Sequence, residues 1–314
     1  MDFFQILSDI EKVDADVYDR FDTRRQVFKN LSGMGKKLTA ATLPAVLSTM
    51  FTKAYGQTTG TLSQVIIDTL NLALSLEYLE FYYYSRGITS GLLTGVDLNA
   101  ITIIRDDEQG HINALRAVLG SSAIADPGAT SFDYTAGGRL TPFASAALYL
   151  GNAQAFVDTG VRAYKGGAVN LMANKAILTA ALNIHSVEAR HSSHIRTMRR
   201  GLNGAGLTVA GLDGGGGTGS PTPKSWVSLQ EGGGPAPAVT APVYAAGSPA
   251  ATYPAEDNVT QSTSNVQTST TAPAGLTITA AAASEAFDEP LDAATVKTIA
   301  RNFRSATAPA YLFA

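Results

Sequence analysis

The 314-residue chain contains no cysteine. This absence excludes disulfides, thiolate metal sites and cysteine nucleophiles, so any metal would have to be held by carboxylate oxygens and imidazole nitrogens. Charge is scarce as well: 16% of the residues are charged, and the net charge is -3. No basic stretch interleaved with aromatic residues occurs, so the sequence predicts no nucleic-acid partner. It also lacks a Gly-x-Ser-x-Gly motif, a phosphate loop and a dinucleotide fingerprint, which argues against the enzyme classes built on them.

Histidine is rare, and its placement is informative. The chain has four histidines, which all fall in two short windows: His111, His185, His191 and His194. Two of them complete the same motif, a Glu followed three residues later by a His, at Glu108 to His111 and at Glu188 to His191. Residues three apart lie on one face of a helix, so each motif can direct a carboxylate and an imidazole at the same ion.

Both motifs continue rows of apolar residues at helical spacing. Glu108 follows Ile101 and Ile104, and Glu188 follows Ala181 and Ile184. Burying such groups is costly unless they are paired or bind a metal. The pattern therefore favours a site for two metal ions, iron or manganese, over the alternative of hydrogen-bonded polar groups in a helical core.

The apolar periodicity predicts an all-α fold. Four long helices are expected in the part of the chain that spans residues 57–203, at 61–86, 98–119, 141–165 and 170–200. The connection at 120–139 is long and rich in Gly, Pro, Asp and Ser, as a crossover running the height of a bundle would be. We expect a four-helix bundle with this long crossover.

The first helix of the bundle offers further ligands. Glu77 lies on its apolar stripe, and Glu80 lies on the flank of that stripe. Tyr84 follows seven residues after Glu77, and two interpretations are open: amphipathic packing with its hydroxyl at the edge of the core, or a position beside the metal. In the second helix, Asp107 is a candidate acceptor for the ring N–H of a histidine, most plausibly His191 across the bundle.

The start of the chain, residues 1–56, reads in two ways. It contains an amphipathic helical pattern and then Arg24-Arg25 before a weakly apolar run at 38–51, which looks like a twin-arginine export signal. On this interpretation the protein is exported to the periplasm or the extracellular space, and the mature chain begins near Gln57. The alternative is a retained helical extension in a cytoplasmic protein. The run is shorter than the about 20 apolar residues that span a bilayer, so no transmembrane helix is expected.

The end of the chain, residues 204–314, is rich in Gly, Ser, Thr and Pro and is expected to form an irregular, low-complexity arm. The segments at 239–244 and 276–279 alternate enough to predict short strands or extended chain lying on the bundle. Asp292 precedes an apolar pattern at Val296, Ile299 and Phe303, which predicts a capped amphipathic helix near the end of the chain. Such an arm could wrap a neighbouring subunit, so a homo-oligomer is expected.

Four segments taken together resemble the bacterial ferritin-like proteins of the desiccation-related type: 76–80, 108–111, 156–164 and 187–191. The resemblance covers roughly residues 62–200. It implies a ferritin-like bundle in which iron or manganese is held by five main ligands: Glu77 (or Glu80), Glu108, His111, Glu188 and His191. It also implies the handling of O2, peroxide or metal in stress protection, and a di-iron oxidoreductase is one such activity.

One position departs from the family pattern. The family usually has a Glu in the third helix where this chain has Val157. Asp158 could replace it as a ligand, but its helical face is shared with Arg162 and Lys165, which predicts an ion pair at the surface. The sequence therefore predicts three inward carboxylates and two imidazoles, and a site that is partly degraded. The alternative function is a metal-free structural or assembly protein on the same scaffold.

Overall fold

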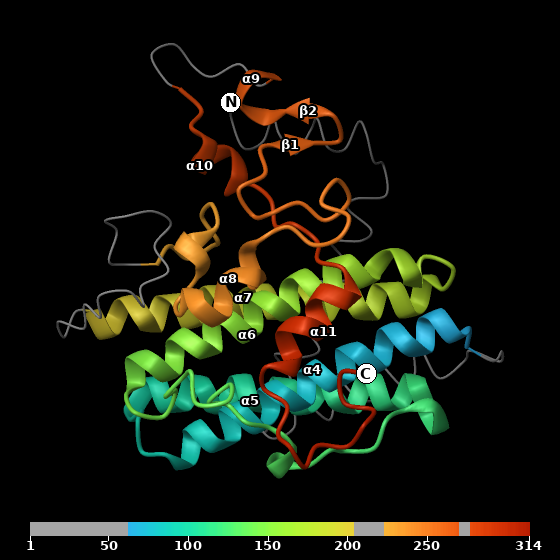
Figure 1. Ribbon diagram of the computed structural model, residues 1–314, viewed down its shortest axis with the longest axis vertical. Coiled ribbons are helices and arrows are strands. Elements are labelled where there is room, and N and C mark those ends of the chain that lie inside the picture. The colour runs from blue at the N-terminus through green and yellow to red at the C-terminus, as the bar shows by residue number, and fades with distance from the viewer. Residues whose placement is uncertain (1–61, 204–222, 270–276) are drawn as a thin grey trace, which may run out of the picture. The chain divides into compact units, whose positions relative to one another are not determined.

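The computed structural model describes residues 62–203, 223–269 and 277–314 (Figure 1), all within the compact unit Leu47–Ala314. The predicted N-terminal extension or export signal at 1–56, including the apolar run at 38–51, lies outside the described residues. Among the helices that the structure describes, none combines the length and the apolar character that crossing a membrane requires.

Four long helices form the expected bundle. They are α4 (Gln64–Thr89), α5 (Gly95–Leu119), α6 (Ala146–Gly167) and α7 (Lys175–Asn203). Helix α4 packs against α5, α6 packs against α7, and α4 also contacts α6 (Figure 1). The prediction of an all-α four-helix bundle is confirmed.

Local sequence sets where the bundle helices begin and end. Ser145 caps α6, because its hydroxyl accepts a hydrogen bond from the backbone N–H of Leu148 at 3.2 Å. Helix α5 ends at Gly120, whose φ of 55° suits a residue without a side chain. The long connection to α6 then contacts the bundle, where the hydroxyl of Tyr134 donates to the carbonyl of Leu79 at 2.8 Å. Short 3-10 turns lie between the helices, at η2 (Gly120–Ser122), η3 (Ala129–Ser131) and η4 (Ala168–Leu171).

The described part of the C-terminal arm contains short elements joined by irregular chain. They are η5 (Glu231–Gly233), α8 (Pro237–Tyr244), β1 (Thr260–Gln261), β2 (Ser264–Asn265), α9 (Val266–Ser269), α10 (Ala280–Ser284) and α11 (Ala293–Arg301). Strands β1 and β2 pair antiparallel.

The expectation of a strand or extended chain at 239–244 is wrong, because this segment is helix α8. Pro237 suits the first turn of a helix, where its missing N–H costs nothing. Val239 and Val243, four residues apart, are both buried, a spacing that fits one face of a helix. Helix α8 lies on α6, so the expected position on the bundle is correct although the conformation is not. The described residues of the second segment, 277–279, form no strand, but the backbone of Thr279 is extended, as the alternative of extended chain predicts.

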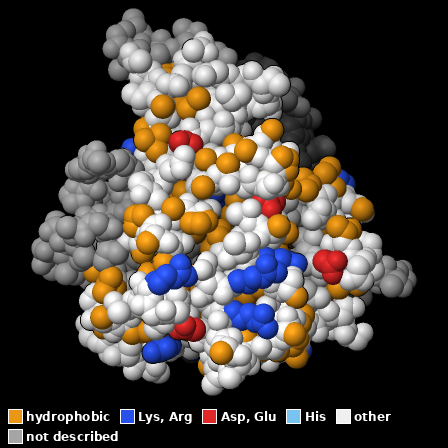
Figure 2. All heavy atoms as spheres, in the orientation of Figure 1, with side chains coloured by type: hydrophobic (Ala, Val, Ile, Leu, Met, Phe, Trp, Pro, Cys, Tyr) orange, Lys and Arg blue, Asp and Glu red, His pale blue; other side chains and the backbone are white. Residues whose placement is uncertain are grey.

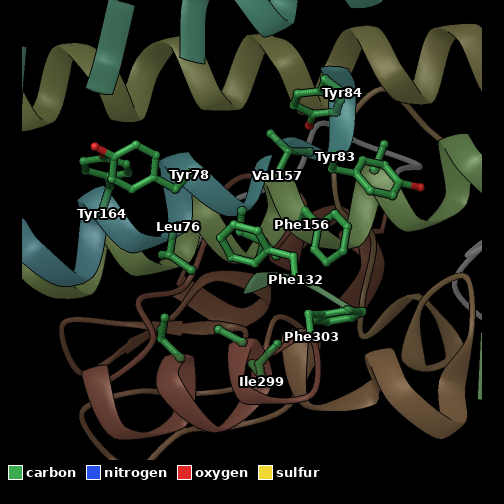
Figure 3. Close-up of a cluster of buried hydrophobic side chains, with 14 of the residues drawn as sticks. Leu76, Tyr78, Tyr83, Tyr84, Phe132, Phe156, Val157, Tyr164, Ile299 and Phe303 are labelled. Atoms are coloured by element: carbon green, nitrogen blue, oxygen red, sulfur yellow. The ribbon is translucent and has the colours of Figure 1, made fainter. Parts of the chain in front are cut away.

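The predicted C-terminal helix is α11, and it docks onto the bundle. Asp292 caps it by accepting a hydrogen bond from the N–H of Thr295 at 2.9 Å. Val296 and Phe303 are buried, and the ring centroid of Phe303 lies 4.7 Å from that of Phe156 on α6 (Figure 3). The arm thus shares a core with its own bundle. Assembly of subunits through the arm stays a prediction.

The surface reflects the low charge content. On the face shown in Figure 2, apolar side chains are spread between a small number of charged groups. Inside the bundle, in contrast, several carboxylates and two imidazoles are buried.

Candidate metal centre

Six polar side chains from three helices of the bundle are buried together, each at most 8% exposed: Glu77 and Glu80 on α4, Glu108 and His111 on α5, and Glu188 and His191 on α7. Both Glu-x-x-His motifs thus face the interior, as their apolar stripes predict. The other two histidines lie apart from this cluster. His185 contacts the carbonyl of Val161, and His194 is exposed.

Three carboxylates surround one ring nitrogen of His111. Its Nδ1 atom lies 2.9 Å from Glu108 Oε2, 3.1 Å from Glu77 Oε2 and 3.1 Å from Glu188 Oε1. One ligand atom from each of these four residues lies within 4.8 Å of the others. This group can hold one metal ion.

The remaining oxygens of the same two glutamates face the second histidine. Nδ1 of His191 lies 3.1 Å from Glu108 Oε1 and 3.8 Å from Glu188 Oε2. The centroids of the two imidazole rings are 6.1 Å apart. Glu108 and Glu188 therefore each present one oxygen to each imidazole, which is the arrangement of carboxylates that bridge two metal ions in such bundles.

Four buried atoms of this cluster have no hydrogen-bond partner among the described residues. They are Glu108 Oε1, both side-chain oxygens of Glu188 and Nδ1 of His191. Leaving such groups buried and unpaired is costly. Their number, their type and their convergence fit the oxygen- and nitrogen-rich ligand set that iron or manganese takes in a two-metal site.

Asp107 lies where the sequence analysis expects it. Its Oδ2 atom is 3.1 Å from Nε2 of His191, so it can accept the ring N–H. With a metal bound, this contact would fix the tautomer in which Nδ1 of His191 is unprotonated and can bind the ion. Asp107 belongs to α5 and His191 to α7, so the contact also holds the ring from across the bundle.

Glu80 turns inward rather than lying on the flank of α4. Its Oε2 atom accepts a hydrogen bond from the hydroxyl of Tyr84 at 2.8 Å. A Cβ atom at Gly160 would lie 3.3 Å from Glu80 Oε1 and 3.6 Å from Glu188 Oε2, so the two carboxylates approach the same point on α6. Among the described residues, the cluster therefore has four carboxylates rather than the three expected from the sequence. Tyr84 contacts Glu80 and not Glu77.

Tyr164 on α6 also belongs to the site, although no sequence motif predicts it there. Its hydroxyl donates a hydrogen bond to Oε1 of Glu77, and the side chain is 7% exposed. The signal was its helical spacing, because Tyr164 shares a stripe of α6 with Val157 and Val161.

The prediction that Asp158 forms an ion pair at the surface is wrong, and the residue is not a candidate ligand either. It is 3% exposed and lies outside the cluster, where it pairs with the guanidinium of Arg196 and accepts hydrogen bonds from the hydroxyls of Ser192 (2.6 Å) and Tyr244 (2.7 Å). The predicted partner Arg162 instead pairs with Glu256 at 2.8 Å. The face of α6 that carries Asp158 is covered by the arm, which single-helix periodicity does not reveal.

Burial and neighbouring charges shift the protonation of the cluster. Burial raises the pKa of Glu77 to about 8, against the opposing effect of His111. Burial and then the neighbouring carboxylates hold the pKa of Glu80 well above its usual value. For His111 and His191, burial lowers the pKa, but the surrounding carboxylates outweigh it and raise it well above the ordinary value.

The pKa of Glu108 shifts in the opposite direction to that of Glu77 and Glu80. Burial raises its pKa, but the charge of His191 and the hydrogen bond from His111 prevail and lower it. The metal-free cluster therefore retains protons on the imidazoles and on some of the carboxylates at neutral pH. Two divalent cations would replace these protons.

Comparison with known proteins agrees with this geometry. Residues 66–200 match the family model of the ferritin-like domain, a range that begins inside α4 and ends inside α7. No curated protein and no solved structure matches the chain. The four-helix part of the chain, which holds the buried Glu and His cluster, therefore resembles a ferritin-like domain in sequence and in fold.

Proposed function

We propose that this protein is a di-metal carboxylate protein that binds iron or manganese and handles O2, peroxide or metal in stress protection. The observation that carries the proposal is the position of Glu108 and Glu188, each of which presents one oxygen to His111 and the other to His191. The resemblance to desiccation-related proteins supports the stress setting.

The residues divide between two metal positions. Glu77 and His111 would hold one ion, His191 would hold the other, and Glu108 and Glu188 would bridge them. Glu80 Oε1 and Glu188 Oε2 both approach Gly160, so Glu80 would bind the second ion and supply the carboxylate that Val157 does not. On this proposal the site is complete, because a glutamate from α4 takes the place of one from α6.

A bound pair of iron or manganese ions supplies the electron-transfer steps that reduce O2 or peroxide. The chain's own residues prepare the site. Tyr164 and Tyr84 donate hydrogen bonds to Glu77 and Glu80 and so hold those carboxylates in position. Asp107 orients the ring of His191. Each of the six inward side chains is nearly inaccessible, which excludes bulk water from the centre.

Anaerobic titration of the metal-free protein with Fe(II) or Mn(II) tests this function. We expect two ions per chain, and loss of both positions in Glu108→Gln and Glu188→Gln, because each variant removes an anionic bridge. Glu285→Gln is the matched control, since Glu285 lies in the arm and bonds Ser228. The loaded protein should then consume O2 or peroxide. A wild-type chain that binds no metal would favour the structural or assembly alternative.

We propose export as a separate property of the chain. It is supported by the sequence around Arg24 and Arg25 alone. Changing both to Lys should leave the protein in the cytoplasm, whereas the natural chain should be recovered outside it and begin near Gln57. A cytoplasmic natural chain beginning at Met1 would contradict the proposal.

A further inference from the structure

A pocket of about 190 Å³, open to solvent on one side, lies beside the candidate metal centre. It is bounded by α4, the end of α6, the turn η4, α7 and the helix α11 of the arm. Its walls are mainly apolar, and the residues that form them include Leu70, Leu76, Tyr164, Leu171, Ala181 and Val296. Leu76 and Tyr164 lie on the same side of the buried cluster drawn in Figure 3.

Tyr164 joins this cavity to the metal centre. Its side chain lines the cavity, and its hydroxyl donates to Oε1 of Glu77. Ala73, which also lines the cavity, precedes Glu77 by one helical turn. A molecule that filled the cavity would therefore be separated from a ligand of the metal centre by one phenol ring.

The polar groups of the cavity include two of opposite charge, Lys297 and Asp68. Asp68 is exposed and accepts a hydrogen bond from Gln64 Nε2 at 2.8 Å. Lys297 is half-buried, and among the described residues it has neither an ion pair nor a side-chain hydrogen bond. Its ammonium group is thus the charge available to a ligand.

Size and charge together define the ligand. A dry apolar cavity of about 150 Å³ holds one benzene molecule, so 190 Å³ leaves room for one ring or a short alkyl chain and a small polar group. The apolar wall would bury the hydrocarbon part, and Lys297 would pair with an anion. We infer that this cavity binds a small monocarboxylic acid with an aromatic or short alkyl body, whose apolar part lies against Tyr164.

This inference deepens the proposed function, because it names the class of molecule that the metal centre would meet. The claim that the bound acid is a substrate rests on that proposed function. Binding itself does not require metal, so the two can fail separately.

Calorimetric titration of the metal-free full chain tests binding, with three probes of the same shape and different charge: benzoate, benzyl alcohol and benzylamine. We expect one benzoate per chain and weaker binding of the other two. Equal or tighter binding of benzylamine would show that Asp68 and not Lys297 sets the charge preference. Failure of all three probes to bind would overturn the inference as a whole.

Two pairs of variants locate the bound probe. Ala73→Leu adds an isopropyl group inside the cavity and should abolish benzoate binding, whereas Ala294→Leu adds the same group on the exposed side of α11 and should not. Lys297→Met keeps the apolar stem and should weaken benzoate about fivefold without affecting benzyl alcohol. Lys175→Met, an exposed residue on α7, is its control. Equal effects within either pair would place the probe elsewhere.

A final arm separates this inference from the proposed function. Benzoate should alter the optical or magnetic spectrum of the metal-loaded wild type, and this change should be absent in Ala73→Leu. If benzoate binds as expected but the chain takes up no metal, the proposed function fails and the binding site stands. If metal binds and benzoate does not, the proposed function stands and the inferred binding site fails. Benzoate binding with an unchanged spectrum would overturn the link to the metal centre.

Discussion

Glu80 on α4 faces the backbone of Gly160 on α6, where a Cβ atom would lie 3.3 Å from Glu80 Oε1. Helix α6 thus contributes space to the metal centre, and α4 contributes the carboxylate that fills it. On the proposed function, this relationship would reconcile Val157 with a complete set of ligands, because Glu80 would supply the anionic oxygen that is missing from α6.

Gly160→Ala should therefore weaken metal binding. The added methyl group would crowd both Glu80 and Glu188, and displacement of supporting groups around a metal typically lowers affinity by about tenfold or more. Metal titration measures the effect. Gly201→Ala is the control, because nothing lies within 4 Å of its added carbon. It should leave affinity unchanged and stabilise α7 by up to about 1 kcal/mol. Equal affinities in the two variants would show that Glu80 needs no space at Gly160.

Glu80→Gln should reduce the number of tightly bound ions from two per chain toward one. The amide keeps an acceptor for the Tyr84 hydroxyl, but it removes the negative charge that a second divalent cation requires. Elemental analysis after dialysis against a weak chelator measures the stoichiometry. Two tightly retained ions in this variant would mean that Glu80 is only a hydrogen-bonding residue.

Asp158→Ala should destabilise the fold without changing the metal content. The variant leaves Arg196 buried without this partner, and breaking a buried pair in this way typically costs about 3 to 5 kcal/mol. Denaturant unfolding measures the loss. Asp106→Ala removes the partner of Arg105 in a more exposed pair and should cost under about 1 kcal/mol. A large drop in metal stoichiometry for the folded Asp158 variant would return this residue to the metal site.

Glu256 should make stability depend on pH. Burial raises its pKa to about 8 against the lowering effect of Arg162, and its Oε2 atom has no hydrogen-bond partner in the described part of the chain. The folded state therefore holds this proton more tightly than the unfolded state, whose pKa is near 4.5. The stabilisation is complete below pH 4.5 and is lost as the pH rises to about 8.

Unfolding free energies measured across that range check this sign. Glu256→Gln should gain stability relative to the natural chain as the pH rises. Asp257→Asn, at the exposed neighbouring residue, should show no such trend. A constant difference between Glu256→Gln and the natural chain at all pH values would refute the account of this carboxyl.

Much of the bundle follows from sequence because its helices carry their own signals. Apolar stripes predict the four helices, and the placement of the few histidines predicts His111 and His191 as metal ligands. The arm was harder to predict. Its helix α8 is too short for strong periodicity, and its packing on α6 depends on tertiary contacts that no local pattern encodes.

The site shows the same limit. Helical spacing brought Glu108, His111, Glu188 and His191 together correctly. The same spacing predicts that Asp158 faces solvent, because the periodicity of a single helix carries no information about the arm that covers that face. It also left Glu80 on the flank of α4, because the space that draws it inward is created by Gly160 on another helix.

The central claim is that the Glu and His cluster is a two-metal site, and anomalous diffraction from crystals of the iron- or manganese-loaded protein tests it most directly. The account predicts two peaks about 3.5 to 4 Å apart, both bridged by Glu108 and Glu188, with His111 on one ion and His191 on the other. An intact cluster without a peak, or peaks that lie away from these four residues, would contradict it.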